Sequence, residues 1–410
     1  MAEQTRGALA GALGWVAAGS MVANVCAYLI HLTASRWWLS TAEYGELAVG
    51  LSAMLVLGVA ALALQAVIAR AVVQRTGTGR IRTVTIQTVA VVAVLVVVGT
   101  PIMAWATSTG PDTAGAALLT APLLTLVGAG QGVLQGRGQF RLLAWVLAVV
   151  GVLRTAPVMV ALAMGAGPAG ALLAGVLGTG VAALVVGWAV RATRVDDPRP
   201  QESALDLGDV VRASGVQLVL VVAASIDLLL SRSVLSPDDA GIYALGAIAT
   251  KVAFWLPQAV GVVFYPRLAD PATSGRSLRH AVGVVAAIGV VLTIGAGVAG
   301  PLVPIVVRPD YEPLVPLLWL FAYTGATLAV LQVALLSAIA RRATAVSSVT
   351  WAVVVVEAVV IVTVVQSIVA LAVTAAVSAT VAAAVTTTVG LRRTSADPVD
   401  PPTTEDATRD

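Results

Sequence analysis

The sequence predicts an all-α polytopic membrane protein, with about 12 transmembrane helices in two six-helix bundles that are parallel repeats of each other. The first observation behind this prediction is composition: of 410 residues, 59% are hydrophobic and 11% are charged, and the mean hydropathy is +0.95. Soluble proteins carry about 25% charged residues, so a soluble fold is excluded. The second observation is a series of long apolar runs, and the third is an internal repeat.

The apolar runs recur almost from end to end, separated by short polar breaks. Each is close to the roughly 20 residues that a helix needs to cross a hydrocarbon core of about 30 Å. In order, the expected helices cover residues 10–33, 45–69, 83–107, 113–135, 142–163, 168–190, 210–231, 241–265, 281–305, 313–339, 343–365 and 368–390.

The internal repeat starts in the stretch 35–56, which recurs without a gap 196 positions later. Each copy has the end of an apolar helix, a short polar turn and a second helix that opens with glycine. The matching residues are Ser35, Arg36, Leu39, Ser40, Gly45, Ala48, Gly50, Ala53 and Val56 in the first copy, and Ser231, Arg232, Leu235, Ser236, Gly241, Ala244, Gly246, Ala249 and Val252 in the second. This pattern indicates a duplication.

The duplication and a polar segment predict the domain organisation. We expect an N-terminal six-helix lobe over 1–190, a cytoplasmic inter-lobe linker over 191–209 and a C-terminal lobe over 210–393. Six is an even number, so both lobes begin on the same side and are related by a pseudo-twofold axis along the membrane normal. The acidic, proline-bearing segment 394–410 is expected to be a disordered tail.

The basic residues predict the orientation, since those that flank membrane helices accumulate in the cytoplasm. With both termini cytoplasmic, nineteen of the 24 basic residues fall inside, and Arg36, Arg232 and Arg308 fall outside. Arg154 and Lys251 lie within helices. The expected location is therefore the cell (plasma or inner) membrane, and the net charge of +3 reports topology rather than nucleic-acid binding.

The first expected helix carries a polar stripe. Ser20, Asn24, Tyr28, His31 and Ser35 are spaced at helical intervals, so all five lie on one narrow face. A water-filled substrate cavity explains such a stripe, and we assign Asn24, Tyr28 and His31 to its lining. Interhelical hydrogen bonding is the alternative interpretation.

The eighth expected helix has a similar polar face, with Lys251 and Gln258 on it. Lys251 is the only lysine of the chain. We assign both residues to the substrate cavity, where the cation would meet an anionic group. The alternative is an internal ion pair of Lys251 with Asp227 or Glu357.

Three further charges lie within helices: Arg154, Asp227 and Glu357. Each costs free energy in the bilayer unless it is paired or faces water, so each is a candidate functional residue. Arg154 and Glu357 occupy nearly corresponding helices, and a buried pair between the lobes is as well supported as a role in transport. Asp227 or Glu357 is a candidate site for a coupling proton or sodium ion.

The sequence predicts no cofactor and no metal site. Cys26 is the single cysteine, and the two histidines are far apart. The glycine-rich turn at 135–141 lacks the lysine and hydroxyl of a nucleotide-binding P-loop.

The repeated segments resemble the polysaccharide (O-antigen type) flippases of the multidrug/oligosaccharidyl-lipid/polysaccharide exporter superfamily, and the likeness spans nearly the whole chain. The residues that carry it are Ser35-Arg36, Glu43-Tyr44-Gly45, Ala69-Arg70, Ile226-Asp227, Leu235-Ser236-Pro237, Ala240-Gly241-Ile242-Tyr243, Leu256-Pro257, the run from Phe264 to Leu268, the run from Val306 to Pro313, and Ala340-Arg341-Arg342.

The resemblance implies two six-helix bundles around a central cavity, lined largely by helices one, two, seven and eight, that opens alternately to the two faces. It implies a flippase that moves isoprenoid-diphosphate-linked oligosaccharide from the inner to the outer leaflet for cell-surface polysaccharide synthesis. The nearest alternative is a cation-coupled multidrug exporter of the same superfamily. A membrane glycan polymerase or acyltransferase would need a large loop with acidic, histidine or arginine groups, so we expect no enzyme.

Overall fold

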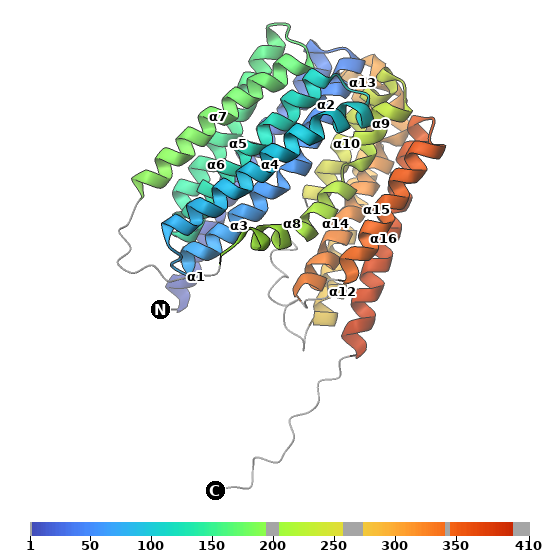
Figure 1. The fold of residues 1–410 in the computed structure, drawn as a ribbon. Helices are drawn as coiled ribbons and strands as arrows, with labels where there is room; N and C mark the ends of the chain where they lie inside the picture. Colours follow the sequence, from blue (N-terminus) through green and yellow to red (C-terminus); the bar gives the residue numbers. More distant parts are fainter. Residues whose placement is uncertain (1, 194–204, 257–273, 341–344, 397–410) are drawn as a thin grey trace, which may run out of the picture.

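The structure is a computed structural model of the chain, and it describes residues 2–193, 205–256, 274–340 and 345–396. The described elements are helices in two groups that lie side by side (Figure 1). The first group contains α1 (Ala2–Thr33), the π-helical turn η1 (Ala34–Trp38), α2 (Thr41–Leu57), α3 (Val59–Val73), α4 (Thr78–Thr107), α5 (Pro111–Gly136), α6 (Phe140–Ala163) and α7 (Pro168–Ala192).

The second group contains α8 (Leu207–Ala223), α9 (Ile226–Val234), α10 (Pro237–Trp255), α12 (Ser274–Ala299), η2 (Gly300–Leu302), α13 (Val303–Val306), η3 (Pro309–Leu317), α14 (Leu318–Ala340), α15 (Ala345–Val364) and α16 (Ile368–Ala396). Within the first group α1 packs on α6 and α3 on α5, and within the second α14 packs on α10, α12 and α16.

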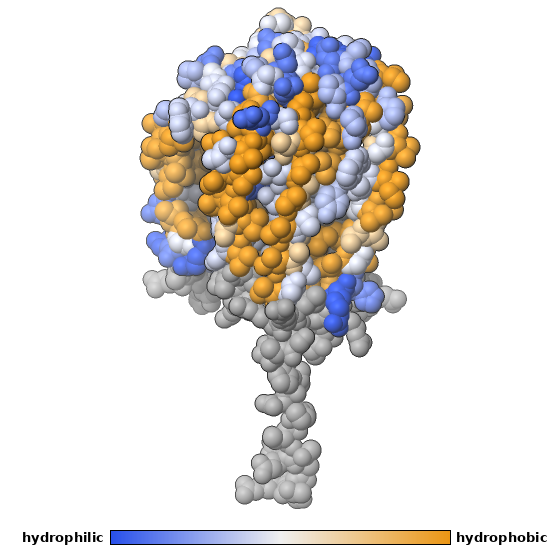
Figure 2. All heavy atoms as spheres, turned by 90° about the vertical axis from the view of Figure 1, so that its right-hand side faces the viewer, coloured by the Kyte–Doolittle hydropathy of each residue, from blue (hydrophilic) through white to orange (hydrophobic). Residues whose placement is uncertain are grey.

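The expected membrane fold is confirmed. Ten described helical segments are long and apolar enough to cross a membrane. The other two expected spans correspond to α10, which carries Asp238, Asp239 and Lys251, and to α15, whose described apolar part is Ser348–Val364. Figure 2 shows a band of hydrophobic side chains across one face, with hydrophilic residues beyond both of its edges.

The helices share two ends. We call the end at which α1 begins and α16 ends the terminal end, and the opposite one, where α2 begins and α13 lies, the far end (Figure 1). Exposed tryptophans mark both: Trp37 and Trp105 toward the far end, Trp145 and Trp188 toward the terminal end, with exposures of 64%, 84%, 69% and 68%. Amphipathic rings prefer the interface between lipid and water, so these positions delimit the membrane.

Each repeat folds in the same way because its polar turn caps a helix. Ser40 is the N-cap of α2: its hydroxyl accepts a hydrogen bond from the backbone NH of Glu43, whose carboxylate accepts one from the Ser40 NH. At the matching position, Ser236 caps α10 by accepting a bond of 3.1 Å from the NH of Asp239. A side-chain oxygen at this position satisfies one of the unpaired NH groups that begin a helix.

The two halves meet where the repeated glycines lie. A Cβ atom on Gly45 would lie 2.9 Å from the backbone nitrogen of Gly241, and one on Gly241 would overlap the carbonyl oxygen of Thr41. Gly45 and Gly241 are equivalent positions of the repeat, and equivalent positions can touch only where the axis that relates them passes. The pseudo-twofold axis therefore runs between α2 and α10 at the far end.

The helices depart from the expected boundaries at three places. The seventh helix, expected as one span over 210–231, is interrupted at Ala224 and Ser225 between α8 and α9. Helix α8 begins at Leu207, within the segment expected as a linker, because Asp206 and Asp209 form a capping box, and α8 packs on α3. Helix α16 continues to Ala396, past the expected start of the tail at Thr394, and 397–410 lie outside the described residues.

We predict that Gly241→Ala lowers the thermal unfolding midpoint of the protein in detergent. The added methyl group has no space beside the Thr41 carbonyl, and forcing atoms into a packed contact costs about 1–3 kcal/mol. Gly283→Ala in α12 is the control, because its Cβ would meet no atom within 4 Å. Equal midpoints for the two variants would show that the glycine contact is not needed for packing.

Candidate functional site

A cavity of about 410 Å³ lies within the first group of helices. Side chains from α1, α2, α3, α5, α6 and α7 surround it, and Lys251 and Trp255 of α10 contribute from the second group. It is therefore a chamber of the N-terminal half that the C-terminal half completes on one side.

The polar stripe of α1 lies along this cavity. Ser20, Asn24, Tyr28 and His31 are among its lining residues. Ser35 is fully buried instead, and its hydroxyl donates a hydrogen bond of 2.7 Å to the carbonyl oxygen of His31. Four of the five stripe residues thus share one chamber with Lys251, as the helical spacing indicates.

The two cations predicted within helices both reach the cavity. Lys251 Nζ donates a hydrogen bond of 2.8 Å to the hydroxyl of Ser52 in α2, on the other half of the molecule. Arg154 comes from α6, and the described part of the chain offers its guanidinium no hydrogen bond or ion pair. Neither cation forms an ion pair with a described residue, although Lys251 interacts electrostatically with Asp227.

The proposed intramembrane ion pairs are not formed. The ion pairs among the described residues join Arg212 to Asp206 and Asp209, and Arg308 to Asp310. Lys251 and Asp227 interact electrostatically without forming a direct ion pair, and Arg154 and Glu357 form none. The physical reason is position: Arg154 faces the chamber of the N-terminal half, whereas Glu357 lies in α15 of the other half.

The two carboxylates form a separate cluster in the C-terminal half. Asp227 is 5% exposed, and the Tyr243 hydroxyl donates a hydrogen bond of 2.5 Å to its Oδ2. Glu357 is 4% exposed and interacts electrostatically with Asp227, since α15 packs against α9. Neither lines the cavity that holds Lys251.

The repeat places a polar residue at the same point in both halves. Asp227 is the equivalent of His31, 196 positions later. His31 Nδ1 and the Tyr44 hydroxyl are 3.1 Å apart, so each member of this pair of positions bonds a tyrosine of the following helix. In the first half this position is His31, which lines the cavity, whereas in the second half it is Asp227, which is buried away from the cavity.

The cavity contains residues that sequence reasoning did not select. Gln65 of α3, Gln131 of α5 and Trp255 of α10 line it. The two glutamines lie near the ends of expected helices, where polar residues are ordinary, and their only signal was that both interrupt apolar runs. Gln258, which we assigned to the cavity, lies outside the described residues.

The cavity differs from the one that the resemblance implies. A cavity lined largely by helices one, two, seven and eight was expected, but none of the described lining residues belongs to α8 or α9. Close contact of α2 with α10 closes the far end. Along α1 the exposure of the lining residues falls from Asn24 through Tyr28 to His31, which lies nearest the far end and is 9% exposed, so the chamber is more open toward the terminal end.

An apolar groove of about 510 Å³ adjoins the cavity. It lies between α1 of the first half and α10, α12 and α14 of the second. Tyr28 lines both spaces and is the one polar residue among the described residues of the groove, which include Leu29, Leu245 and Val252. Helix α1 therefore lies between a chamber that carries charged and polar groups and an apolar groove.

The described polar residues that line the chamber are basic or uncharged. None of the described residues that line it is Asp or Glu. Among the described residues, no three His, Cys, Asp or Glu side chains are grouped to hold a metal ion. The chamber offers two cations together with neutral amide, hydroxyl and imidazole groups.

Solved structures of similar fold were found for this geometry. An inward-facing multidrug resistance MATE family transporter of the MOP superfamily matches with a TM-score of 0.66 and 12% identity, covering 92% of this chain and 95% of its own. An outward-facing structure of such a transporter matches with a TM-score of 0.63 and 15% identity over 94% and 96%.

A third similar structure is a MOP superfamily transporter from Pyrococcus furiosus, with a TM-score of 0.57 and 16% identity over 94% and 96% of the two chains. Its description states that reverse polarity of the binding pocket suggests a different function. No protein-family model and no curated protein sequence matches the chain. These likenesses show that the chain has the two-lobed fold of MATE transporters.

We predict that Tyr243→Phe destabilises the protein by about 1–3 kcal/mol, because it removes the hydroxyl that bonds the buried Asp227 carboxyl. Thermal unfolding in detergent measures the effect. Tyr28→Phe is the control, since the structure records no hydrogen bond from the Tyr28 hydroxyl to any described residue. If Tyr243→Phe were as stable as Tyr28→Phe, the hydrogen bond would have no structural role.

Proposed function

We propose that this protein is an alternating-access flippase that moves isoprenoid-diphosphate-linked oligosaccharide from the inner to the outer leaflet. The observation that carries the proposal is the charge of the chamber: Arg154 and Lys251 face it, and none of its described lining residues is acidic. In a site shielded from bulk water, unpaired cations favour an anionic ligand strongly.

The parts of such a substrate correspond to the parts of the site. A diphosphate accepts hydrogen bonds from the planar guanidinium of Arg154 and from the Lys251 ammonium. Sugar hydroxyls exchange hydrogen bonds with Asn24, Gln65 and Gln131. The hydrocarbon chain fits the apolar groove beyond Tyr28, which adjoins the chamber.

The direction of loading follows from the same geometry. The chamber is more exposed toward the terminal end, where α3 has Arg70 in its last turn, Arg75 lies in the α3–α4 connection and Arg80 lies in the first turn of α4. Basic residues beside membrane helices mark the cytoplasmic side. In our proposal both termini are cytoplasmic, and the headgroup enters from that side of the cell membrane.

A cation-coupled multidrug exporter is the second candidate, and one observation favours it. Asp227 and Glu357 are two buried acids close enough to interact, and such a pair can take up a proton or a sodium ion. The chamber itself opposes this function for cationic drugs, because its two charges would repel them. Coupling by these acids is compatible with either substrate.

We predict that Lys251→Ala and Arg154→Ala each reduce translocation of a fluorescent isoprenoid-diphosphate oligosaccharide about tenfold or more in reconstituted vesicles. Loss of one charge-assisted hydrogen bond costs about 1.5–3 kcal/mol, which corresponds to that factor. Accessibility of the fluorophore to a membrane-impermeant quencher measures translocation.

The matched control is Arg141→Ala, which removes an arginine of the same half that stacks over Trp15 outside the cavity. It should translocate at the wild-type rate. Absence of translocation by the wild-type protein would refute the flippase proposal. Export of a cationic drug that is lost in Asp227→Asn or Glu357→Gln would support the exporter in its place.

A further inference from the structure

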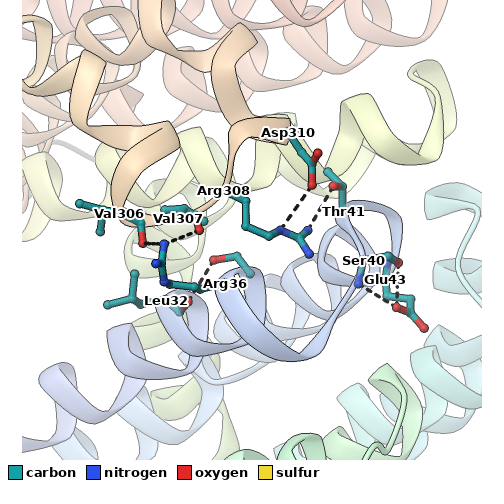
Figure 3. Close-up of polar contacts among 10 residues, drawn as sticks. Leu32, Arg36, Ser40, Thr41, Glu43, Val306, Val307, Arg308 and Asp310 are labelled. Atoms are coloured by element: carbon teal, nitrogen blue, oxygen red, sulfur yellow. Dashed lines mark hydrogen bonds and ion pairs between the residues drawn. The ribbon is translucent and has the colours of Figure 1, made fainter.

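Arginine side chains bridge the two halves at the far end. The Nη1 atom of Arg36, in η1, donates hydrogen bonds of 2.6 and 2.7 Å to the carbonyl oxygens of Val306 and Val307 (Figure 3). The same atom lies 3.0 Å from the carbonyl oxygen of Ile305. Arg36 belongs to the N-terminal half, and its acceptors lie at the end of α13 in the C-terminal half. The bridge therefore spans the line along which the halves would separate.

A second arginine makes the reverse contact. Arg232, at the end of α9 in the C-terminal half, donates a hydrogen bond of 2.9 Å from Nη1 to the carbonyl oxygen of Ala42 in α2. Arg36 and Arg232 are equivalent positions of the repeat. Each leaves its own half and binds the backbone of the other, on either side of the axis that passes between Gly45 and Gly241.

The acceptors explain why Arg36 binds where it does. The last four carbonyl groups of a helix have no partner within that helix and carry partial negative charge. The acceptors of Arg36 are such groups, at the end of the continuous run of α12, η2 and α13. Nη1 carries two hydrogens, so the three carbonyl oxygens around it share the donors of one NH2 group of the guanidinium.

The same acceptors make the contact reversible. A backbone carbonyl is neutral, so parting from an arginine does not strand a buried full charge, as breaking a buried ion pair would. Once the halves part, water can solvate both the carbonyls and the guanidinium. Arg36 and Arg232 are both only half-buried, which places water within reach.

We propose that Arg36 and Arg232 form a reciprocal latch that holds the two halves together at the far end and breaks when the molecule opens there. The inference rests on the proposed function only in assuming that the far end opens. Arg308 lies beside the latch and makes a weaker contact between the halves (Figure 3). Its Nη2 atom lies 3.4 Å from the Thr41 hydroxyl of the other half, and its Nε atom pairs with Asp310 of its own half.

The latch is tested by measuring the distance between the two halves at the far end. Cys26→Ala removes the single cysteine. Met164→Cys, in the α6–α7 turn, and Gln366→Cys, between α15 and α16, then give two exposed labelling sites, one on each half. Electron-spin distance measurements on the full-length protein in detergent and in lipid report the closed and open populations.

We predict that Arg36→Ala and Arg232→Ala each raise the ratio of long to short distances about tenfold, which corresponds to about 1.4 kcal/mol. Arg36→Lys, which keeps the charge but has no fork, should give an intermediate ratio. Arg141→Ala, at the opposite end of the first half, should leave the distribution unchanged.

Wild-type distributions in Arg36→Ala, Arg232→Ala and the double variant would overturn the proposal. If Arg36→Ala did not fold, the Arg36→Lys and Arg232→Ala distributions would decide in its place, and no change in either would overturn it. The readout needs no substrate. If the arginine variants raised the ratio of long to short distances but the wild-type protein did not translocate the lipid, the flippase proposal would be contradicted and the latch proposal would still hold.

Discussion

The contact between Gly45 and Gly241 is the constraint on which the rest of the structure depends. Backbone lies against backbone there, because neither residue has a side chain and a Cβ on either would collide with the other helix. Since the two positions are equivalent in the repeat, the contact also fixes the pseudo-twofold axis. The halves converge at this end, and any chamber has to open toward the other.

The distribution of charge follows the same division. The cations Arg154 and Lys251 reach the chamber, whereas the acids Asp227 and Glu357 are enclosed in the C-terminal half. A charged side chain within a bilayer raises the free energy unless it faces polar groups or is hydrogen-bonded. The cations face the chamber, and the acid Asp227 is hydrogen-bonded to Tyr243. The duplicated framework thus places its intramembrane cations at the chamber and its intramembrane acids in a separate cluster of the C-terminal half.

Features set by neighbours in sequence could be predicted, because turn chemistry and helical periodicity act over a few residues. The offset of 196 positions paired Ser40 with Ser236, and both are N-caps. Helical spacing placed Asn24 on the face that the structure turns to the cavity.

Features set by long-range packing could not be predicted. Lys251 bonds Ser52, 199 residues away, and nothing local distinguishes this from an ion pair with Asp227. The break at Ala224 and Ser225 contains no glycine or proline to indicate it. Gln131 was missed because a polar residue near a helix end is ordinary, and only its neighbours across the chamber give it a role.

The central claim is that α1 borders a water-filled chamber entered from the terminal end. The direct test is the reaction of Asn24→Cys, in a Cys26→Ala background, with a membrane-impermeant maleimide in vesicles of known orientation. We expect labelling from the terminal side, and none for Val22→Cys, which lies on the same helix outside the cavity lining. Equal inertness of the two cysteines from both sides would contradict the account.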